Sequence, residues 1–173
     1  MVVEKNNNLI KLAILFYLCS IIGYIYEMIL CFIYNGKFLS HGILYGPWLP
    51  IYGTGSLLIS CLSKYRKHPL LIFILSFFIS GILEYLCGFL LLKYLDMRLW
   101  DYRGWFLNIN GFVCLISAFI FGIGGLLITY VLLPFINVIL KKANKNCINS
   151  ILIGLTSIFS IDVLATIFKQ LIK

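Results

Sequence analysis

Residues 69–94 read PLLIFILSFFISGILEYLCGFLLLKY, and this stretch decides the fold class. Glu84 is the single charged side chain between Pro69 and Leu92. An α-helix needs about 20 consecutive, mostly apolar residues to cross the hydrocarbon core of a bilayer. The stretch therefore predicts a transmembrane helix over 69–94. Pro69 suits its first turn, where a missing amide hydrogen removes no helical hydrogen bond.

Similar apolar runs recur along the 173 residues, of which 62% are hydrophobic and 12% are charged. Soluble domains are about 45–50% apolar and about 25% charged, so both departures indicate lipid as the solvent. We expect an all-α membrane protein with a single transmembrane domain over 1–173. The predicted bundle has five spans, at 9–34, 43–62, 69–94, 111–140 and 147–171.

Three features complicate this pattern of spans. Pro47 and Pro50 predict a broken start to the second span, because proline interrupts helical hydrogen bonding. Segment 95–110 holds two Asp, two Arg, two Trp and two Asn. Since Trp favours the membrane–water interface, we interpret segment 95–110 as an interfacial aromatic segment between spans three and four. In the long fourth run we expect Pro134 to kink or end the helix, and a sixth span is an alternative.

The net charge of +8 comes from 14 Lys and Arg against six Asp and Glu. The basic residues cluster between apolar runs, which favours the positive-inside rule over nucleic-acid binding. If the N-terminus and loops 63–68 and 141–146 share one side, that side holds eight basic residues and the other holds six. This bias predicts a multi-pass protein of the cell membrane with a cytoplasmic N-terminus.

The sequence disfavours several kinds of chemistry. No two of the six cysteines lie within ten residues of one another, so no Cys-x-x-Cys metal or redox pair exists. The Gly-x-x-x-x-Gly-Lys-Ser/Thr phosphate-binding loop is missing, which argues against ATP hydrolysis by this chain. His41 and His68 fall in loops on opposite sides, which argues against a Ser-His-Asp triad. We expect no metal and no cofactor, and we assign no catalytic residue.

Three acidic residues, Glu27, Glu84 and Asp162, fall inside the apolar runs. A charge at the bilayer centre costs about 2.5–3.5 kcal/mol on insertion scales, so such residues face a bundle interior and are functional candidates. With the N-terminus inside, all three fall at similar depth in the outer half of the membrane. This convergence predicts one polar pocket. The alternative is that each acid is satisfied within a packing face, and for Asp162 we weigh the two roles equally.

The predicted pocket also draws on segment 42–53 and on the aromatic segment. The alternatives are an interfacial loop for the former and an exposed amphipathic loop for the latter. The two glutamates are expected to bind a cationic group or to carry protons. The predicted substrate-binding residues are Tyr24, Glu27, Pro47, Pro50, Tyr52, Gly53, Glu84, Trp100, Asp101, Tyr102 and Asn108.

The order of these residues resembles a known pattern. It comprises Gly23-Tyr24-x-x-Glu27, Gly46-Pro47-x-x-Pro50-x-Tyr52-Gly53, Glu84-Tyr85, Trp100-Asp101-Tyr102 and Asn108-x-x-Gly111. The chain resembles the putative ABC-transporter type IV permease family of small bacterial membrane proteins, from Gly23 to Gly125. That family often has Trp-Gly in the fourth span, where this chain has Phe121-Gly122. The resemblance implies a membrane component of a transport system, with a separate ATPase subunit as a possible partner.

Three functional hypotheses follow. The first is a transport component that binds a small or amphipathic solute in the outer-half pocket. The second is an intramembrane enzyme acting on a lipid or a lipid-linked substrate, with two carboxyls as acid and base. The third is a non-catalytic assembly or regulatory subunit. In all three the lipid bilayer surrounds the chain.

Overall fold

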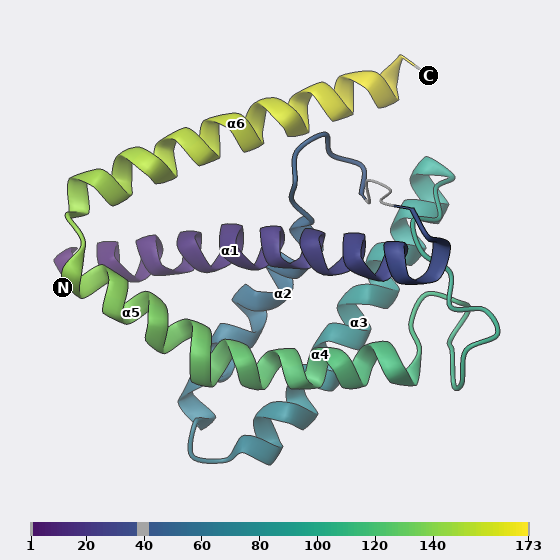
Figure 1. Ribbon diagram of the computed structural model, residues 1–173, viewed down its shortest axis with the longest axis horizontal. Helices are drawn as coiled ribbons and strands as arrows, with labels where there is room; N and C mark the ends of the chain where they lie inside the picture. The colour runs from purple at the N-terminus through teal and green to yellow at the C-terminus, as the bar shows by residue number, and fades with distance from the viewer. Residues whose placement is uncertain (1, 38–41, 173) are drawn as a thin grey trace. The chain divides into compact units, whose positions relative to one another are not determined.

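The computed structural model describes residues 2–37 and 42–172, and within them all regular secondary structure is helical. Ile109 and Val113 form an isolated bridge. Figure 1 shows the helices, which are α1 (Val2–Asn35), α2 (Pro50–Ser60), the 3₁₀ helix η1 (Cys61–Tyr65), α3 (Pro69–Leu95), α4 (Leu115–Leu127), the π-helix η2 (Ile128–Leu132), α5 (Leu133–Lys142) and α6 (Lys145–Leu171). The predicted all-α fold is confirmed.

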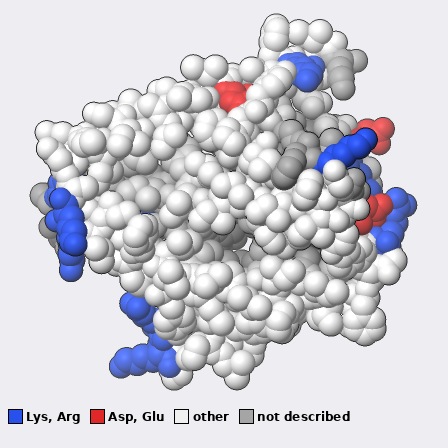
Figure 2. All heavy atoms as spheres, in the orientation of Figure 1, with Lys and Arg blue, Asp and Glu red and all other residues white. Residues whose placement is uncertain are grey.

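Four helical stretches are long and apolar enough to cross a membrane, namely Asn7–Tyr34, Pro69–Leu95, Leu115–Lys142 and Lys145–Gln170. Each has between 26 and 28 residues, and a helix rises about 1.5 Å per residue, so each can span a hydrocarbon core of about 30 Å. In Figure 2 the Lys and Arg side chains form small groups separated by wide areas without charge. The chain is a multi-pass membrane protein.

The second predicted span differs from these four. Residues 42–49 are not helical, and α2 begins at Pro50 rather than at residue 43. This helix has 11 residues, and η1 extends the helical path to Tyr65. Proline lacks an amide hydrogen and is tolerated in the first helical turn, so the expected break falls directly before Pro50.

The long fourth run is one helical path through α4, η2 and α5, so the structure gives one span here and not two. In the π-helical turn the amide of Leu133 donates to the carbonyl of Ile128, five residues earlier. Pro134 follows directly. A proline within a helix offers no amide hydrogen and clashes with the carbonyl four residues earlier, and a wider turn relieves that clash. A local π turn therefore accommodates Pro134, and the helix does not end there.

The chain divides into two compact units, Met1–Gly53 with Ile136–Lys173, and Thr54–Phe135. We call them the α1–α6 unit and the α3–α4 unit. In the α1–α6 unit, α1 and α6 pack through edge-to-face rings of Phe16, Tyr17 and Phe159, with centroids 5.3–5.9 Å apart. Tyr17 also donates a hydrogen bond of 3.0 Å to Thr156 on α6. The single domain over 1–173 stays a prediction.

Closely packed small residues hold the α3–α4 unit together. One face of α3 buries a residue at every fourth position, namely Ile72, Ser76, Ser80, Glu84 and Gly88. On α4, a Cβ added at Gly125 would overlap the side chain of Ser76, and one at Gly122 would press on the ring of Phe73. Small residues let membrane helices approach closely. Close packing is important here because the hydrophobic effect does not drive helices together within lipid.

We predict that Gly125→Ala destabilises the α3–α4 unit, because the added methyl group must displace Ser76 or separate the helices. Overpacking a tight interface costs about 1–3 kcal/mol, so the melting temperature in detergent should fall. Gly124→Ala is the matched control, since a Cβ there meets no atom within 4 Å. Its melting temperature should stay the same or rise, because alanine favours helix over glycine. Equal melting temperatures for the two variants would contradict tight packing at Gly125.

Candidate functional site

Glu27 is paired with a tyrosine in the α1–α6 unit. Its carboxylate accepts a hydrogen bond from the hydroxyl of Tyr52, which lies on α2. The tyrosine ring approaches α1 at Gly23, where a Cβ would overlap the ring. Glycine at this position is therefore what allows Tyr52 to reach Glu27. Two motifs that are distant in the sequence, Gly-Tyr-x-x-Glu and Pro-x-Tyr-Gly, thus meet in one contact.

The other predicted residues of this unit are close in sequence to Glu27 or to Tyr52. Gly53 is buried, and a Cβ there would overlap the side chain of Ser20 on α1. Tyr24 is half-buried on α1, Pro47 is exposed in the non-helical segment, and Pro50 begins α2. Gly53 and Pro50 therefore fix how closely and at which point α2 meets α1.

Glu84 is paired with a tyrosine and a serine in the α3–α4 unit, and its side chain is only 4% exposed. Tyr102 donates from Oη to Oε1 at 2.8 Å, and Ser117 donates from Oγ to Oε2 at 2.9 Å. Ser117 belongs to the capping box at the start of α4, whose N-cap residue is Cys114. Burial of a carboxyl group is unfavourable without hydrogen bonds, and here each oxygen has a donor.

Tyr102 lies in the connection 96–114 between α3 and α4, which is ordered by its own hydrogen bonds. The Tyr102 amide donates to the Gly111 carbonyl at 2.9 Å. The side chain of Asn108 donates to the Trp105 carbonyl at 2.9 Å and accepts from the Gly111 amide at 3.2 Å. The indole of Trp100 donates to a backbone carbonyl at 2.8 Å, in the same connection. Asn108 and Trp100 thus hold the loop that presents Tyr102 to Glu84.

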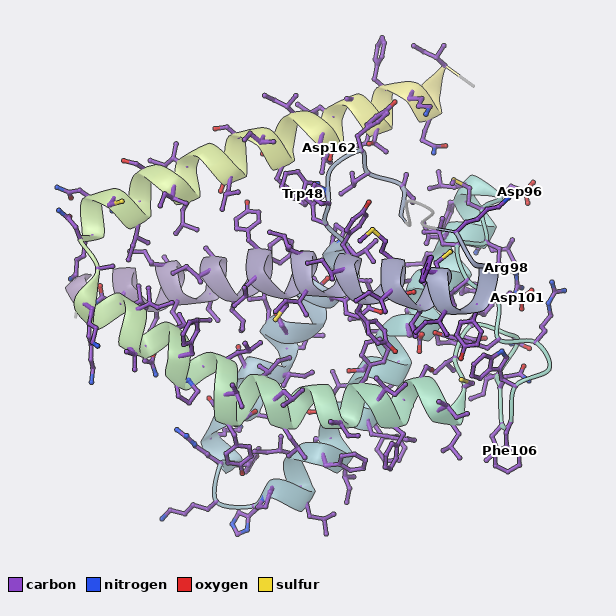
Figure 3. The ribbon with its side chains drawn as sticks, viewed as in Figure 1. Trp48, Asp96, Arg98, Asp101, Phe106 and Asp162 are labelled. Atoms are coloured by element: carbon purple, nitrogen blue, oxygen red, sulfur yellow. The ribbon has the colours of Figure 1, made fainter. Side chains whose placement is uncertain are left out.

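Asp101 is an exposed ion-pair centre in the same connection, and Figure 3 shows it beside Arg98. Arg103 donates from Nε to Oδ2 at 2.7 Å, and Arg98 Nη1 lies 3.2 Å from Oδ1. The hydrogen bonds from Arg103, with the charge of both arginines, lower the pKa of Asp101 from 3.8 to about 2. The same carboxylate raises the pKa of Arg103. Asp101 is therefore ionised at physiological pH, and its contact with a solute stays a prediction.

Asp162 on α6 binds the non-helical segment before α2. Its carboxylate accepts hydrogen bonds from the amides of Tyr45 at 2.9 Å and Gly46 at 2.7 Å, and from the indole of Trp48 at 2.8 Å. Thr166 donates to it at 3.5 Å from the next turn of α6. Figure 3 shows Trp48 and Asp162 next to one another. These contacts favour the packing role for Asp162, because they tie segment 42–49 to α6.

The structure brings the predicted residues together as two pairs. Tyr52 with Glu27 lies in the α1–α6 unit, and Tyr102 with Glu84 lies in the α3–α4 unit. The union of the two pairs in one pocket stays a prediction.

A family model confirms the resemblance of the sequence pattern. The family described as Putative ABC-transporter type IV matches residues 14–167. The chain belongs to this family. The match includes every predicted site residue and the partners of Asp162. No curated protein and no solved structure matches the chain.

Several partners of the intramembrane acids in this family member are not among the predicted residues, namely Ser117, Tyr45, Trp48 and Thr166. Ser117 is the second donor to Glu84, and Tyr45 supplies an amide to Asp162. A signal for Ser117 exists, since it stands three residues after Cys114 where the helical run begins, as in a capping box. Nothing in the sequence pairs Tyr45 with Asp162, because the contact depends on how α6 packs.

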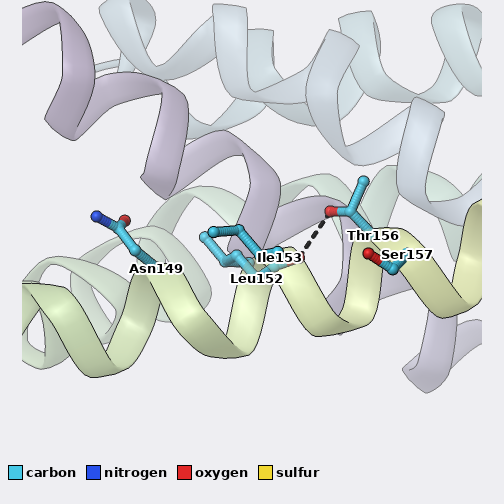
Figure 4. A pocket seen from close by; sticks show the side chains of 5 residues that line it. All are labelled: Asn149, Leu152, Ile153, Thr156 and Ser157. Carbon is cyan, nitrogen blue, oxygen red and sulfur yellow. Dashed lines mark hydrogen bonds between the residues drawn. The ribbon is translucent and has the colours of Figure 1, made fainter.

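Other candidate sites are sparse in the part of the chain that the structure describes. His41 lies outside it. Within residues 2–37 and 42–172, no group of three or more His, Cys, Asp or Glu side chains is placed to hold a metal ion. A hollow of about 460 Å³ runs along α6 and is shown in Figure 4. The side chains that line it, none of them a predicted site residue, are Asn149, Leu152, Ile153, Thr156 and Ser157.

We predict that Asp162→Asn loosens segment 42–49. Asparagine offers one carbonyl oxygen and turns an NH2 group toward the remaining donors, so at least one N–H loses its acceptor. Such a loss costs about 1–3 kcal/mol for a buried group, and about 1.4 kcal/mol corresponds to a tenfold change. Amide hydrogen exchange of Tyr45 and Gly46 should therefore accelerate by roughly tenfold or more.

The control for this variant is Thr166→Val, which removes only the 3.5 Å contact to Asp162. Its exchange rates at Tyr45 and Gly46 should match the unmodified protein when both are followed by hydrogen-exchange mass spectrometry. Unchanged exchange in Asp162→Asn would show that the carboxylate does not hold the segment.

Proposed function

We propose that this protein is a membrane component of an ABC-type transport system and binds a small or amphipathic solute in an outer-half polar pocket. The observation that carries the proposal is the pairing of each intramembrane glutamate with a tyrosine hydroxyl, Tyr52 with Glu27 and Tyr102 with Glu84. Ionisable residues within membrane spans are costly and mark solute or ion pathways. Membership of the family supports the transport class.

The interruption of helical structure next to one of these pairs supports the same proposal. Segment 42–49 is non-helical and leads directly into Pro50, two residues before Tyr52. Transporters commonly build solute sites from discontinuous helices, because the freed backbone groups and the ends of helices can bind polar ligands. The predicted residues in and beside this segment, Tyr24, Pro47, Pro50 and Gly53, would shape the pocket around Glu27.

In this proposal the α3–α4 unit contributes Glu84, Tyr102 and the interfacial residues Trp100, Asp101 and Asn108. The sequence predicts that both glutamates lie in the outer half of their spans, at similar depth, and on that ground the proposal assigns them to one pocket. The glutamates bind a cationic group of the solute or hold protons. A separate ATPase subunit supplies the energy, and the N-terminus lies in the cytoplasm of the cell.

Orientation gives the first test of the proposal. In a variant without native cysteines, a cysteine at Arg103 should react with a membrane-impermeant thiol reagent in intact cells. One at Lys64 should react only in opened membranes, because the basic loops lie in the cytoplasm. The span α3, Pro69–Leu95, separates the two positions by one crossing. Labelling of both positions from the same side would overturn the proposed orientation.

Solute binding gives the second test. We expect a small molecule to co-purify with the protein in detergent or nanodiscs and to be visible by native mass spectrometry. Glu27→Gln should lose this molecule while its melting temperature stays unchanged. Glutamine keeps the side-chain volume and an acceptor for Tyr52, but it has neither the charge nor the titratable proton of a carboxyl group.

The matched control is Glu4→Gln, which makes the same chemical change near the N-terminus of the same helix and should keep the bound molecule. Retention of the molecule by Glu27→Gln at normal stability would remove Glu27 from the site. Turnover of a lipid by the purified protein would favour the enzyme hypothesis instead. Stable association with an ATPase subunit without any bound solute would favour the assembly hypothesis.

A further inference from the structure

The hydroxyl group of Ser117 has one hydrogen and two candidate acceptors. Its oxygen lies 2.9 Å from Oε2 of Glu84 and 2.9 Å from the carbonyl oxygen of Cys114. It also accepts a hydrogen bond of 3.1 Å from the Cys114 amide. A serine hydroxyl donates one hydrogen bond and accepts two. At any moment its hydrogen therefore points mainly to one of these two oxygens.

The choice between the two acceptors depends on whether Glu84 carries a proton. When Glu84 is ionised, Ser117 donates to Oε2, and the Cys114 carbonyl keeps the Ala118 amide as its donor at 3.1 Å. When Oε2 is protonated, its O–H donates to Ser117 Oγ, and the serine hydrogen turns to the Cys114 carbonyl. Ser117 Oγ then accepts from Oε2 and from the Cys114 amide, which fills both lone pairs.

Both arrangements use the same positions of the heavy atoms. In each of them Oε1 of Glu84 accepts from the Tyr102 hydroxyl at 2.8 Å, and Oε2, Ser117 Oγ and the Cys114 carbonyl all have a partner. This matters because an unpaired polar group in a buried site is strongly unfavourable. Ser117 lies in the first turn of α4, and the N-terminus of a helix favours negative charge. Neither protonation state is therefore penalised by a missing hydrogen bond.

The other titratable groups near Glu84 in the α3–α4 unit come from three elements. Tyr102 belongs to the connection 96–114, Cys87 lies one turn further along α3, and Cys114 caps α4 with its sulfur accepting from the Ser117 amide. The tyrosine is a donor to the carboxyl in both arrangements, and the two thiols are neutral small side chains when protonated. Glu84 is thus the group whose protonation changes the direction of the hydrogen bond.

We propose that Glu84, Ser117 and the carbonyl of Cys114 form a proton-binding site, in which Ser117 is a positioning residue that reverses its hydrogen bond as Glu84 gains or loses a proton. The ligand is the proton itself. The site's role in transport rests on the proposed function: Glu84 carries a proton that couples to or regulates the solute site, and Glu27 serves the solute. Proton binding by Glu84 does not require a solute.

Infrared spectroscopy of the purified protein in nanodiscs, without added solute, tests this proposal. A carbonyl stretching band of a protonated carboxyl should appear as the pH is lowered, and it should shift on transfer to heavy water. The band should be missing in Glu84→Gln. In Ser117→Ala its frequency should rise, because the carboxyl O–H loses its acceptor, and Ser117→Thr should restore it by restoring the hydroxyl.

Assignment of the band does not depend on Glu84→Gln being stable. The chain has three glutamates, Glu4, Glu27 and Glu84. Carboxyl-¹³C glutamate shifts the bands of all three, and Glu4→Gln and Glu27→Gln remove the other two. Tyr102→Phe provides a second check, since it removes the donor to Oε1 and should also raise the frequency of the band.

Three results would overturn the proposal. The first is a Glu84 band whose intensity does not change with pH, and the second is the lack of any such band at every pH. The third is a band whose frequency is the same in Ser117→Ala as in the unmodified protein. A pH-dependent Glu84 band in a protein that binds no solute would support the proton-binding site and contradict the proposed solute site. Solute binding without such a band would support the solute site and contradict the proton-binding site.

Discussion

The constraint on which the rest of this structure depends is that backbone N–H and C=O groups in lipid must be hydrogen-bonded within the protein. Continuous helices meet this demand over most of the chain. The informative places are those where the helical pattern stops. At segment 42–49, the carboxylate of Asp162 accepts the amides of Tyr45 and Gly46, and the Leu49 amide donates to the Ser20 carbonyl at 3.0 Å. At Pro134 a π turn widens the helix. At the start of α4 the capping box takes up the first amides.

The same constraint explains the partners of the intramembrane acids. Asp162 is held by two amides and an indole, and Glu27 and Glu84 accept hydrogen bonds from tyrosine and serine hydroxyls. Neutral donors of this kind satisfy a carboxyl group without adding a second charge, whose removal from water would also have to be compensated. The ion pairs described for the chain lie instead in the exposed connection, where Asp101 joins two arginines. Among the described residues, the ion pairs thus lie outside the spans. Within the spans, the acidic side chains are instead hydrogen-bonded to hydroxyl and N–H groups.

Much of the fold could be predicted because long apolar runs have one stable form in lipid. The spans containing Glu27, Glu84 and Asp162, the break before Pro50 and the presence of an aromatic segment between α3 and α4 all follow from composition and from proline. The π turn could not be predicted, since a proline alone does not determine whether a helix kinks, ends or widens. The tyrosine partners were recognised as site residues from their motifs, but their pairing with particular glutamates depends on close approaches such as that at Gly23. The capping-box spacing marks Ser117 locally, but its contact with Glu84 is made across the α3–α4 interface, which no local pattern specifies.

The contact between Asp162 and the segment before α2 also bears on how the protein is made. Tyr45 and its acceptor are separated by 117 positions in the chain. A ribosome adds about 5–20 residues per second, so several seconds pass between synthesis of the segment and synthesis of its partner. During that interval the amides of Tyr45 and Gly46 must be hydrated or held by other groups. Helix α6 therefore completes a piece of backbone made more than 100 residues earlier, and segment 42–49 gains these acceptors only after α6 has been synthesised.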